Sequence, residues 1–168
     1  MASGNKTVGK KRYREKLGRD FDDFEVGDVY EHRPGRTLLQ TDNTWFTLLT
    51  MNTHPIHFDL KHASQSEFKK PLMNSTLTLA VVSGMSVSDT SQRAIANLGW
   101  DKIRLLAPVF DGDTLYAESE VLNKRLSKTR PGQGIVTIRT TGINQDDVPV
   151  VVFERSFLIA QFNNSTGD

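Results

Sequence analysis

The stretch TLTLAVVSGMSV, residues 76–87, decides how the rest of the chain is interpreted. Leu77, Ala80 and Gly84 share one face at helical spacing. Leu79 and Val82 fall on the other side. A helix that is apolar on most sides is buried, so we expect a central helix covered by a sheet. A buried strand is the alternative, because the run contains β-branched residues, but its length favours a helix.

The segments after this run have the residue pattern of β-strands separated by turns. We expect strands at residues 97–106, 114–125, 135–143 and 150–160, joined by an Asp-Gly turn at 111–113, a basic loop at 127–134 and a turn at 144–147. Long strands joined by hairpins favour an antiparallel sheet with the helix packed across it. The fold class is therefore α+β in a single domain, residues 21–160, between a flexible basic arm at 1–20 and a polar tail at 161–168.

The segments before the central helix are shorter. Residues 29–39 read as one or two strands, broken by a turn at Arg33-Pro34-Gly35-Arg36. A short helix follows, with its N-cap at Thr41, Asp42 or Asn43. Residues 60–70 predict a helix and a loop, and Asn74 or Ser75 is the expected cap of the central helix.

Composition narrows the function classes. The chain has 21 Lys and Arg against 20 Asp and Glu, so no global field favours nucleic acid or an anionic membrane. It has no cysteine, which removes disulfides, thiolate catalysis and cysteine zinc sites. No apolar run approaches the roughly 20 residues that span a bilayer, and the N-terminus lacks the apolar core of a secretory signal. We expect a cytoplasmic protein.

The stretch LTMNTHPIHFD, residues 49–59, concentrates groups suited to acid–base chemistry. Pro55 fixes its own φ and restricts His54, so His57 is presented from a defined turn. Imidazole is the side chain best suited to moving protons near neutral pH, whereas Asn52 can orient a water but cannot take its proton. A polar turn whose histidines cap backbone groups is the alternative. No metal site is expected, because no third ligand stands at a recognisable spacing from His54 and His57.

Three stretches resemble the MaoC-like hydratase/dehydratase family: MNTHPIH at 51–57, NST at 74–76 and LAPVFDGD at 106–113. The first is similar to the motif Gly-Asp-x-Asn-Pro-aliphatic-His of (R)-specific enoyl-CoA hydratases. The resemblance implies a hotdog fold, an antiparallel sheet wrapped around one long helix. It departs from the motif at Met51, Asn52 and His54, which replace glycine, aspartate and asparagine.

The resemblance implies reversible addition of water to a 2-enoyl-CoA thioester. It assigns the base to His57, with Asn52 holding the water and His54 and Asp59 in reserve. A free N–H near Ser75, at the positive end of the central helix, would bind the thioester oxygen, with Asn74 and His54 on the substrate side. An amide at position 52 adds no negative charge and no basicity, so His57 alone would move the proton.

The resemblance also suggests a substrate and an assembly. The loop with Lys128 and Arg130, or else Arg104, would meet the phosphates of coenzyme A, although a solvated loop is an equal alternative. The acyl group would lie beside Trp45, Phe46 and Met85, any of which could be plain core. Similar loops suggest branched substrates such as mesaconyl-CoA. Coenzyme A enters as part of the substrate with no separate cofactor, and a homodimer or dimer of dimers is expected.

Three other readings remain. A hotdog thioesterase needs a carboxylate on or near the central helix, and residues 74–87 contain no Asp or Glu. A non-catalytic acyl-CoA-binding subunit would keep the acyl slot without the reaction. A nucleic-acid role through the basic arm is last, since the arm lacks interleaved aromatic residues.

Overall fold

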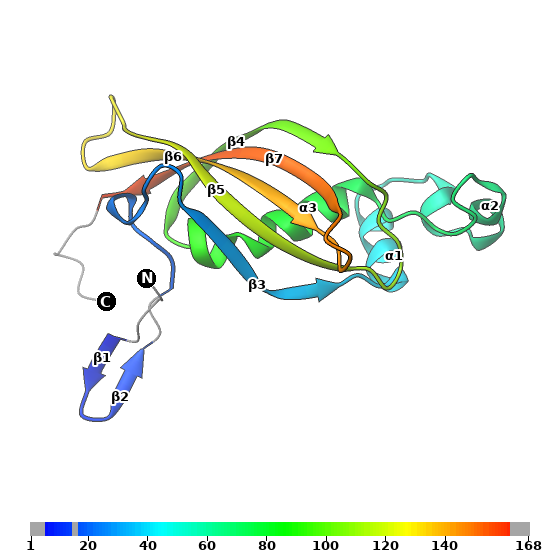
Figure 1. Ribbon diagram of the computed structural model, residues 1–168, viewed down its shortest axis with the longest axis horizontal. Helices are drawn as coiled ribbons and strands as arrows, with labels where there is room; N and C mark the ends of the chain where they lie inside the picture. Colours follow the sequence, from blue (N-terminus) through cyan, green and yellow to red (C-terminus); the bar gives the residue numbers. More distant parts are fainter. Residues whose placement is uncertain (1–5, 15–16, 162–168) are drawn as a thin grey trace.

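The computed structural model describes residues 6–14 and 17–161, in which one curved sheet covers one side of a long helix (Figure 1). The strands are β1 (Lys6–Gly9), β2 (Arg12–Arg14), β3 (Val29–Thr37), β4 (Ala94–Leu105), β5 (Thr114–Leu126), β6 (Gln133–Ile143) and β7 (Pro149–Ala160). The helices are η1 (Phe21–Asp23), α1 (Gln40–Leu49), η2 (Pro55–His57), α2 (Leu60–Gln65), α3 (Ser75–Met85) and η3 (Val87–Ser91).

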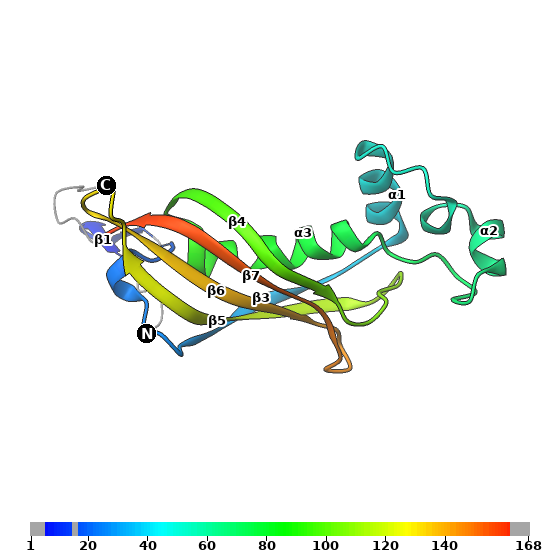
Figure 2. The same ribbon diagram turned by 90° about the horizontal axis from the view of Figure 1, so that it is seen from above.

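The main sheet has five antiparallel strands in the order β3-β5-β6-β7-β4. Along β5 and β6, buried residues alternate with more exposed ones, as expected for strands with one face on a core. The sheet curves over α3, and α1 and α2 project beyond one end of it (Figure 2). The predicted α+β hotdog domain is confirmed.

The central helix is where the sequence placed it, and the strand alternative is wrong. Asn74 caps α3 through its side-chain oxygen, which accepts a hydrogen bond from the N–H of Thr76 at 3.0 Å. Val82 is fully buried against the sheet. A Cβ at Gly142 of β6 would lie 2.6 Å from a methyl group of Val82, so glycine there allows α3 to approach the sheet. The opposite side of α3, with Ala80 and Gly84, is exposed in this chain.

Two local details before α3 differ from the prediction. Of the one or two strands expected, β3 is one, and the expected turn at residues 33–36 is wrong: the strand continues there with an irregular register between His32 and Arg36. The expected N-caps at 41–43 lie inside α1, which begins at Gln40. Its first turn is closed by Asp42, whose carboxylate accepts a hydrogen bond from the N–H of Leu39 at 3.0 Å.

The ends of the chain are described in part. Within the expected arm, residues 6–14 form the β1–β2 hairpin. Asp20 already packs on the domain, where its carboxylate lies 2.9 Å from the guanidinium of Arg93. Flexibility of the arm stays a prediction, and the polar tail at 162–168 lies outside the described residues.

Candidate active site

His57 ends the short η2 turn, and its ring is held in one tautomer. Its Nδ1 lies 2.8 Å from the backbone oxygen of Leu72. A carbonyl can only accept a hydrogen bond, so in the neutral ring the proton sits on Nδ1 and Nε2 keeps a lone pair. No described residue forms a hydrogen bond to Nε2. His57 is only 9% exposed, but its Nε2 is not among the fully buried polar atoms that lack a partner, so this lone pair is accessible to a water.

Asn43, a fully buried residue of α1, connects the His57 turn to the start of α3. Its amide nitrogen donates to the backbone oxygens of His57 (2.8 Å) and Leu72 (3.0 Å). Its side-chain oxygen accepts from the N–H of Asn74 at 2.8 Å. The sequence analysis considered Asn43 only as a helix cap. Its polar side chain on the inward face of α1 is the signal that could have identified it.

The start of α3 offers the donor that the sequence analysis expected. Asn74 is buried and occupies the N–H of Thr76 with its own side chain. The N–H of Ser75, the first helical residue, is among those that a helix leaves without an intrahelical partner. Ser75 is an exposed residue that directly follows Asn74, whose own N–H is bound to Asn43. An N–H that a helix leaves free in this way attracts negative charge.

Asn52 and His54 have turn-forming roles that the sequence analysis raised as the alternative. The side-chain oxygen of Asn52 accepts from the N–H of His54 at 3.0 Å, and Nδ1 of His54 accepts from the N–H of Ile56 at 3.2 Å. The amide nitrogen of Asn52 remains to orient a water. The rings of His54 and His57 are 5.9 Å apart, centre to centre, and that of His62 lies 6.1 Å from His54.

A groove of about 550 Å³ runs along the exposed side of α3. Phe46 of α1 and Leu77, in the first turn of α3, line it near the start of the helix, and Met85 lines it further along. Arg33 and Arg36 of β3 line it as well. Two of the three residues expected around the acyl group therefore border this groove, whereas Trp45 is 66% exposed and does not line it.

The residues expected to bind the phosphates of coenzyme A lie at opposite ends of the sheet within one chain. Lys128 and Arg130 lie in the β5–β6 loop, at the end of the sheet opposite α1 (Figure 1). The hairpin geometry, which sequence reasoning did not resolve, separates them from His57. Arg104 is the second-last residue of β4, and this end of the strand lies at the same end of the sheet as α1 (Figure 1). Its guanidinium donates a hydrogen bond to the backbone oxygen of Ile103 at 2.9 Å.

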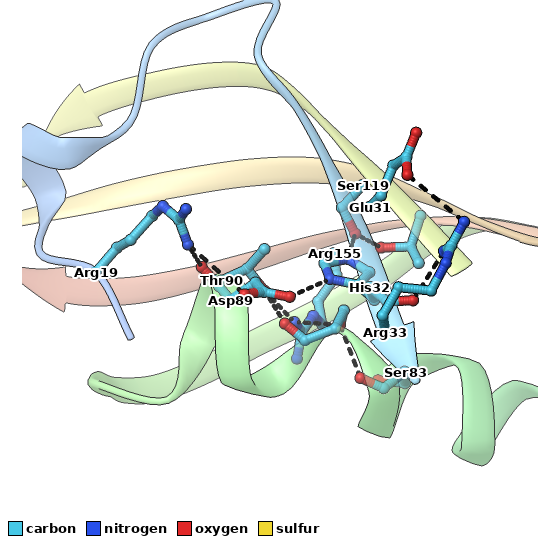
Figure 3. A network of polar contacts seen from close by, with 11 residues as sticks. Arg19, Glu31, His32, Arg33, Ser83, Asp89, Thr90, Ser119 and Arg155 are labelled. Atoms are coloured by element: carbon cyan, nitrogen blue, oxygen red, sulfur yellow. Dashed lines mark hydrogen bonds and ion pairs between the residues drawn. The ribbon is translucent and has the colours of Figure 1, made fainter. Parts of the chain in front are cut away.

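A second polar cluster lies under the sheet, and sequence reasoning missed it. Figure 3 shows His32 between Asp89 and Ser119, with Nδ1 2.9 Å from the carboxylate and Nε2 2.8 Å from the hydroxyl. This is the connectivity of a hydrolytic triad. However, Ser119 is fully buried and its hydroxyl is also 2.8 Å from that of Thr140. No substrate reaches it, so the cluster is structural.

Arg155 completes this cluster as a buried cation. Its guanidinium donates to the hydroxyls of Ser86 (3.0 Å) and Thr90 (3.2 Å). Burial lowers the pKa of Arg155 to about 10, so it stays charged at neutral pH. Burial is also the largest cause that lowers the pKa of His32 below its ordinary value of 6.5, against the opposing effect of Asp89.

Residues 6–14 and 17–161 contain no group of three His, Asp or Glu side chains placed to hold a metal ion. Over the same residues, no helix has the length and apolar character needed to cross a membrane.

The MaoC-like domain family matches residues 23–143. The chain is 30% identical to mesaconyl-CoA hydratase of Cereibacter sphaeroides and 31% identical to beta-methylmalyl-CoA dehydratase of Chloroflexus aurantiacus, each over 142 residues. These alignments cover 84% of this chain but only 41% and 40% of the relatives, so the chain spans less than half of their length. The unliganded R-hydratase PhaJ1 from Pseudomonas aeruginosa is similar in structure, with a TM-score of 0.70, 26% identity and 86% of each chain covered.

Proposed function

The chain belongs to the MaoC-like domain family, and from this premise we propose that it is a hydro-lyase that adds water reversibly to the double bond of a 2-enoyl-CoA thioester. The observation that carries the proposal is the arrangement of His57. Its Nδ1 is bound to the Leu72 carbonyl, and Asn43 joins its turn to the first residues of α3. A base and an oxyanion donor are the two groups that this reaction needs.

The reaction follows from these two groups. Nε2 of His57 accepts a proton from a water that the amide of Asn52 orients, while the water oxygen bonds to the β-carbon. Electrons of the double bond move to the thioester oxygen, where the N–H of Ser75 stabilises the negative charge. The enolate then collapses, and its α-carbon takes the proton from His57. Dehydration is the same path in reverse.

The acyl group that we propose is a short branched one such as mesaconyl. Two relatives carry the names mesaconyl-CoA hydratase and beta-methylmalyl-CoA dehydratase, which supports this choice. The groove along α3 has apolar walls from Phe46 and Leu77, which suit the methyl branch of such a group. We assign the coenzyme A phosphates to Arg104 in the same chain. Lys128 and Arg130 would contribute only from a second copy.

We propose that the protein is a homodimer joined through β4, or a dimer of such dimers. β4 is the last strand in the sheet order, and its free edge can pair with another strand. It also carries large exposed apolar side chains: Ile95, Leu98, Trp100, Ile103 and Leu105. Antiparallel pairing of two such edges would cover them and extend the sheet across a two-fold axis.

Hydration of mesaconyl-CoA and crotonyl-CoA by the purified protein tests the reaction, followed by loss of enoyl-thioester absorbance and by analysis of the product. We expect the same equilibrium ratio of enoyl-CoA to 3-hydroxyacyl-CoA whether the reaction starts from the enoyl-CoA or from the 3-hydroxyacyl-CoA. Binding of these thioesters in a calorimeter without turnover of either would contradict the proposal and favour a non-catalytic subunit.

A further inference from the structure

We propose that His54 hydrogen-bonds a carboxylate on the β-carbon of the substrate, so that the site selects CoA thioesters of 2-butenedioic acids. The inference rests on the proposed hydratase function. In such a thioester, the second carboxylate is bonded directly to the carbon that water attacks. A side chain that recognises it must therefore stand beside the base.

His54 stands in that position. A water held by His57 lies about 3 Å from its Nε2 and about 3–3.5 Å from the β-carbon. The carboxylate oxygens are two bonds beyond that carbon, a few ångströms from the same water. The His54 ring centre is 5.9 Å from that of His57, on the same short turn, so a group bonded to the β-carbon comes within its reach.

The tautomer of His54 provides a donor. Because Nδ1 accepts a hydrogen bond from the N–H of Ile56, the proton of the neutral ring is on Nε2. His54 is exposed, and no described residue accepts a hydrogen bond from its Nε2. This N–H can donate to a carboxylate while the cap of the turn stays in place, so one ring serves both contacts.

The cap alone does not require an imidazole. Asparagine can cap such a turn with its side-chain oxygen, so the second ring nitrogen is not needed for the turn. The arginines of the α3 groove are less suited to the carboxylate. Arg36 lies 2.8 Å from the carboxylate of Asp42, and Arg33 lies 3.5 Å from that of Glu31.

Two substrates and two variants test the proposal. Mesaconyl-CoA and tiglyl-CoA have the same branched enoyl skeleton, but the first has a carboxylate on the β-carbon where the second has a methyl group. His54→Asn keeps the cap and removes the Nε2–H, whereas His54→Ala removes both. We expect His54→Asn to lower the ratio of kcat/KM for mesaconyl-CoA to that for tiglyl-CoA by about 10- to 100-fold, the range for one hydrogen bond to a charged group.

Each outcome has one meaning. A selective loss for mesaconyl-CoA in His54→Asn, together with a loss for both substrates in His54→Ala, supports the proposal. Equal effects on the two substrates in His54→Asn, or no effect, overturn it and leave His54 as a cap of the turn. A wild-type protein that hydrates tiglyl-CoA or crotonyl-CoA but not mesaconyl-CoA overturns it while the hydratase function stands. A wild-type protein that hydrates none of the three refutes the function itself.

Discussion

Removal of the Asn43 side chain should destabilise the protein and also impair its activity. In Asn43→Ala, the buried N–H of Asn74 loses its acceptor, and the backbone oxygens of His57 and Leu72 each lose one donor. These three contacts join the turn that carries His57 to the start of α3. We therefore expect the turn that carries His57 to loosen even where the sheet remains folded.

The loss of stability in Asn43→Ala depends on which of the three backbone groups keep another hydrogen-bond partner. The Asn74 N–H becomes an unsatisfied buried donor, which costs about 1–3 kcal/mol. The His57 oxygen still accepts from Gln40, and the Leu72 oxygen still accepts from Nδ1 of His57, so each of these lost bonds costs about 0.5–1.5 kcal/mol. The sum is about 2–6 kcal/mol, which lowers Tm by at least roughly 4 °C in a protein of this size.

Urea unfolding and thermal unfolding measure this cost in stability. The kcat/KM for an enoyl-CoA measures how far the displacement of the His57 turn impairs activity. Thr44→Ala is the matched control, because Thr44 is the neighbouring residue of α1 and its hydroxyl accepts only from Gln40 at 3.2 Å among the described contacts. We expect the control to cost no more than about 0.5–1.5 kcal/mol, the value of its single part-buried hydrogen bond, which is below the range for Asn43→Ala. A free energy of unfolding for Asn43→Ala as close to wild type as the control would refute the reasoning.

Two other predictions concern pH and assembly. Burial lowers the pKa of His32 in the folded protein. As the pH falls below about 6.5, His32 therefore binds a proton in the unfolded chain before it does so in the folded one. The free energy of unfolding should decrease over this range, until the pH passes the pKa of the folded state. Urea titrations from pH 7 to 5 measure this, and a stability that rises on acidification would contradict it; His32→Gln should flatten the slope. Leu98→Asp places a charge on the exposed face of β4 and should convert the proposed homodimer to a monomer in light scattering. An unchanged mass for this variant would exclude β4 as the interface.

The sequence predicted the parts of the fold that local patterns determine. The alternation of apolar and polar residues located β5, and the asparagine before an apolar run located the start of α3. The turn expected within β3 was wrong because Pro34 and Gly35 are local turn signals, whereas pairing with β5 on both sides of the irregularity keeps the strand continuous. Pairing with a strand distant in the sequence therefore outweighed the local turn preference of residues 33–36.

For the candidate site, the sequence analysis named individual residues but not the contacts that join them. The sequence analysis named His57 and Asn74, which the structure joins through Asn43. It did not identify Asn43 as the connection, because that role depends on two segments that meet only in the fold. The cluster around His32 was missed for the same reason, since its partners Asp89 and Ser119 lie 57 and 87 residues away in the chain.

The kcat/KM for hydration of an enoyl-CoA by wild type and by His57→Gln measures the central claim most directly. Glutamine retains a polar side chain that can donate to the Leu72 carbonyl, but it cannot take a proton from water. Loss of the general base predicts a decrease of about 10²- to 10⁴-fold, with the thermal stability close to that of wild type. A variant that hydrates the substrate at a rate within a few fold of wild type would show that another group removes the proton.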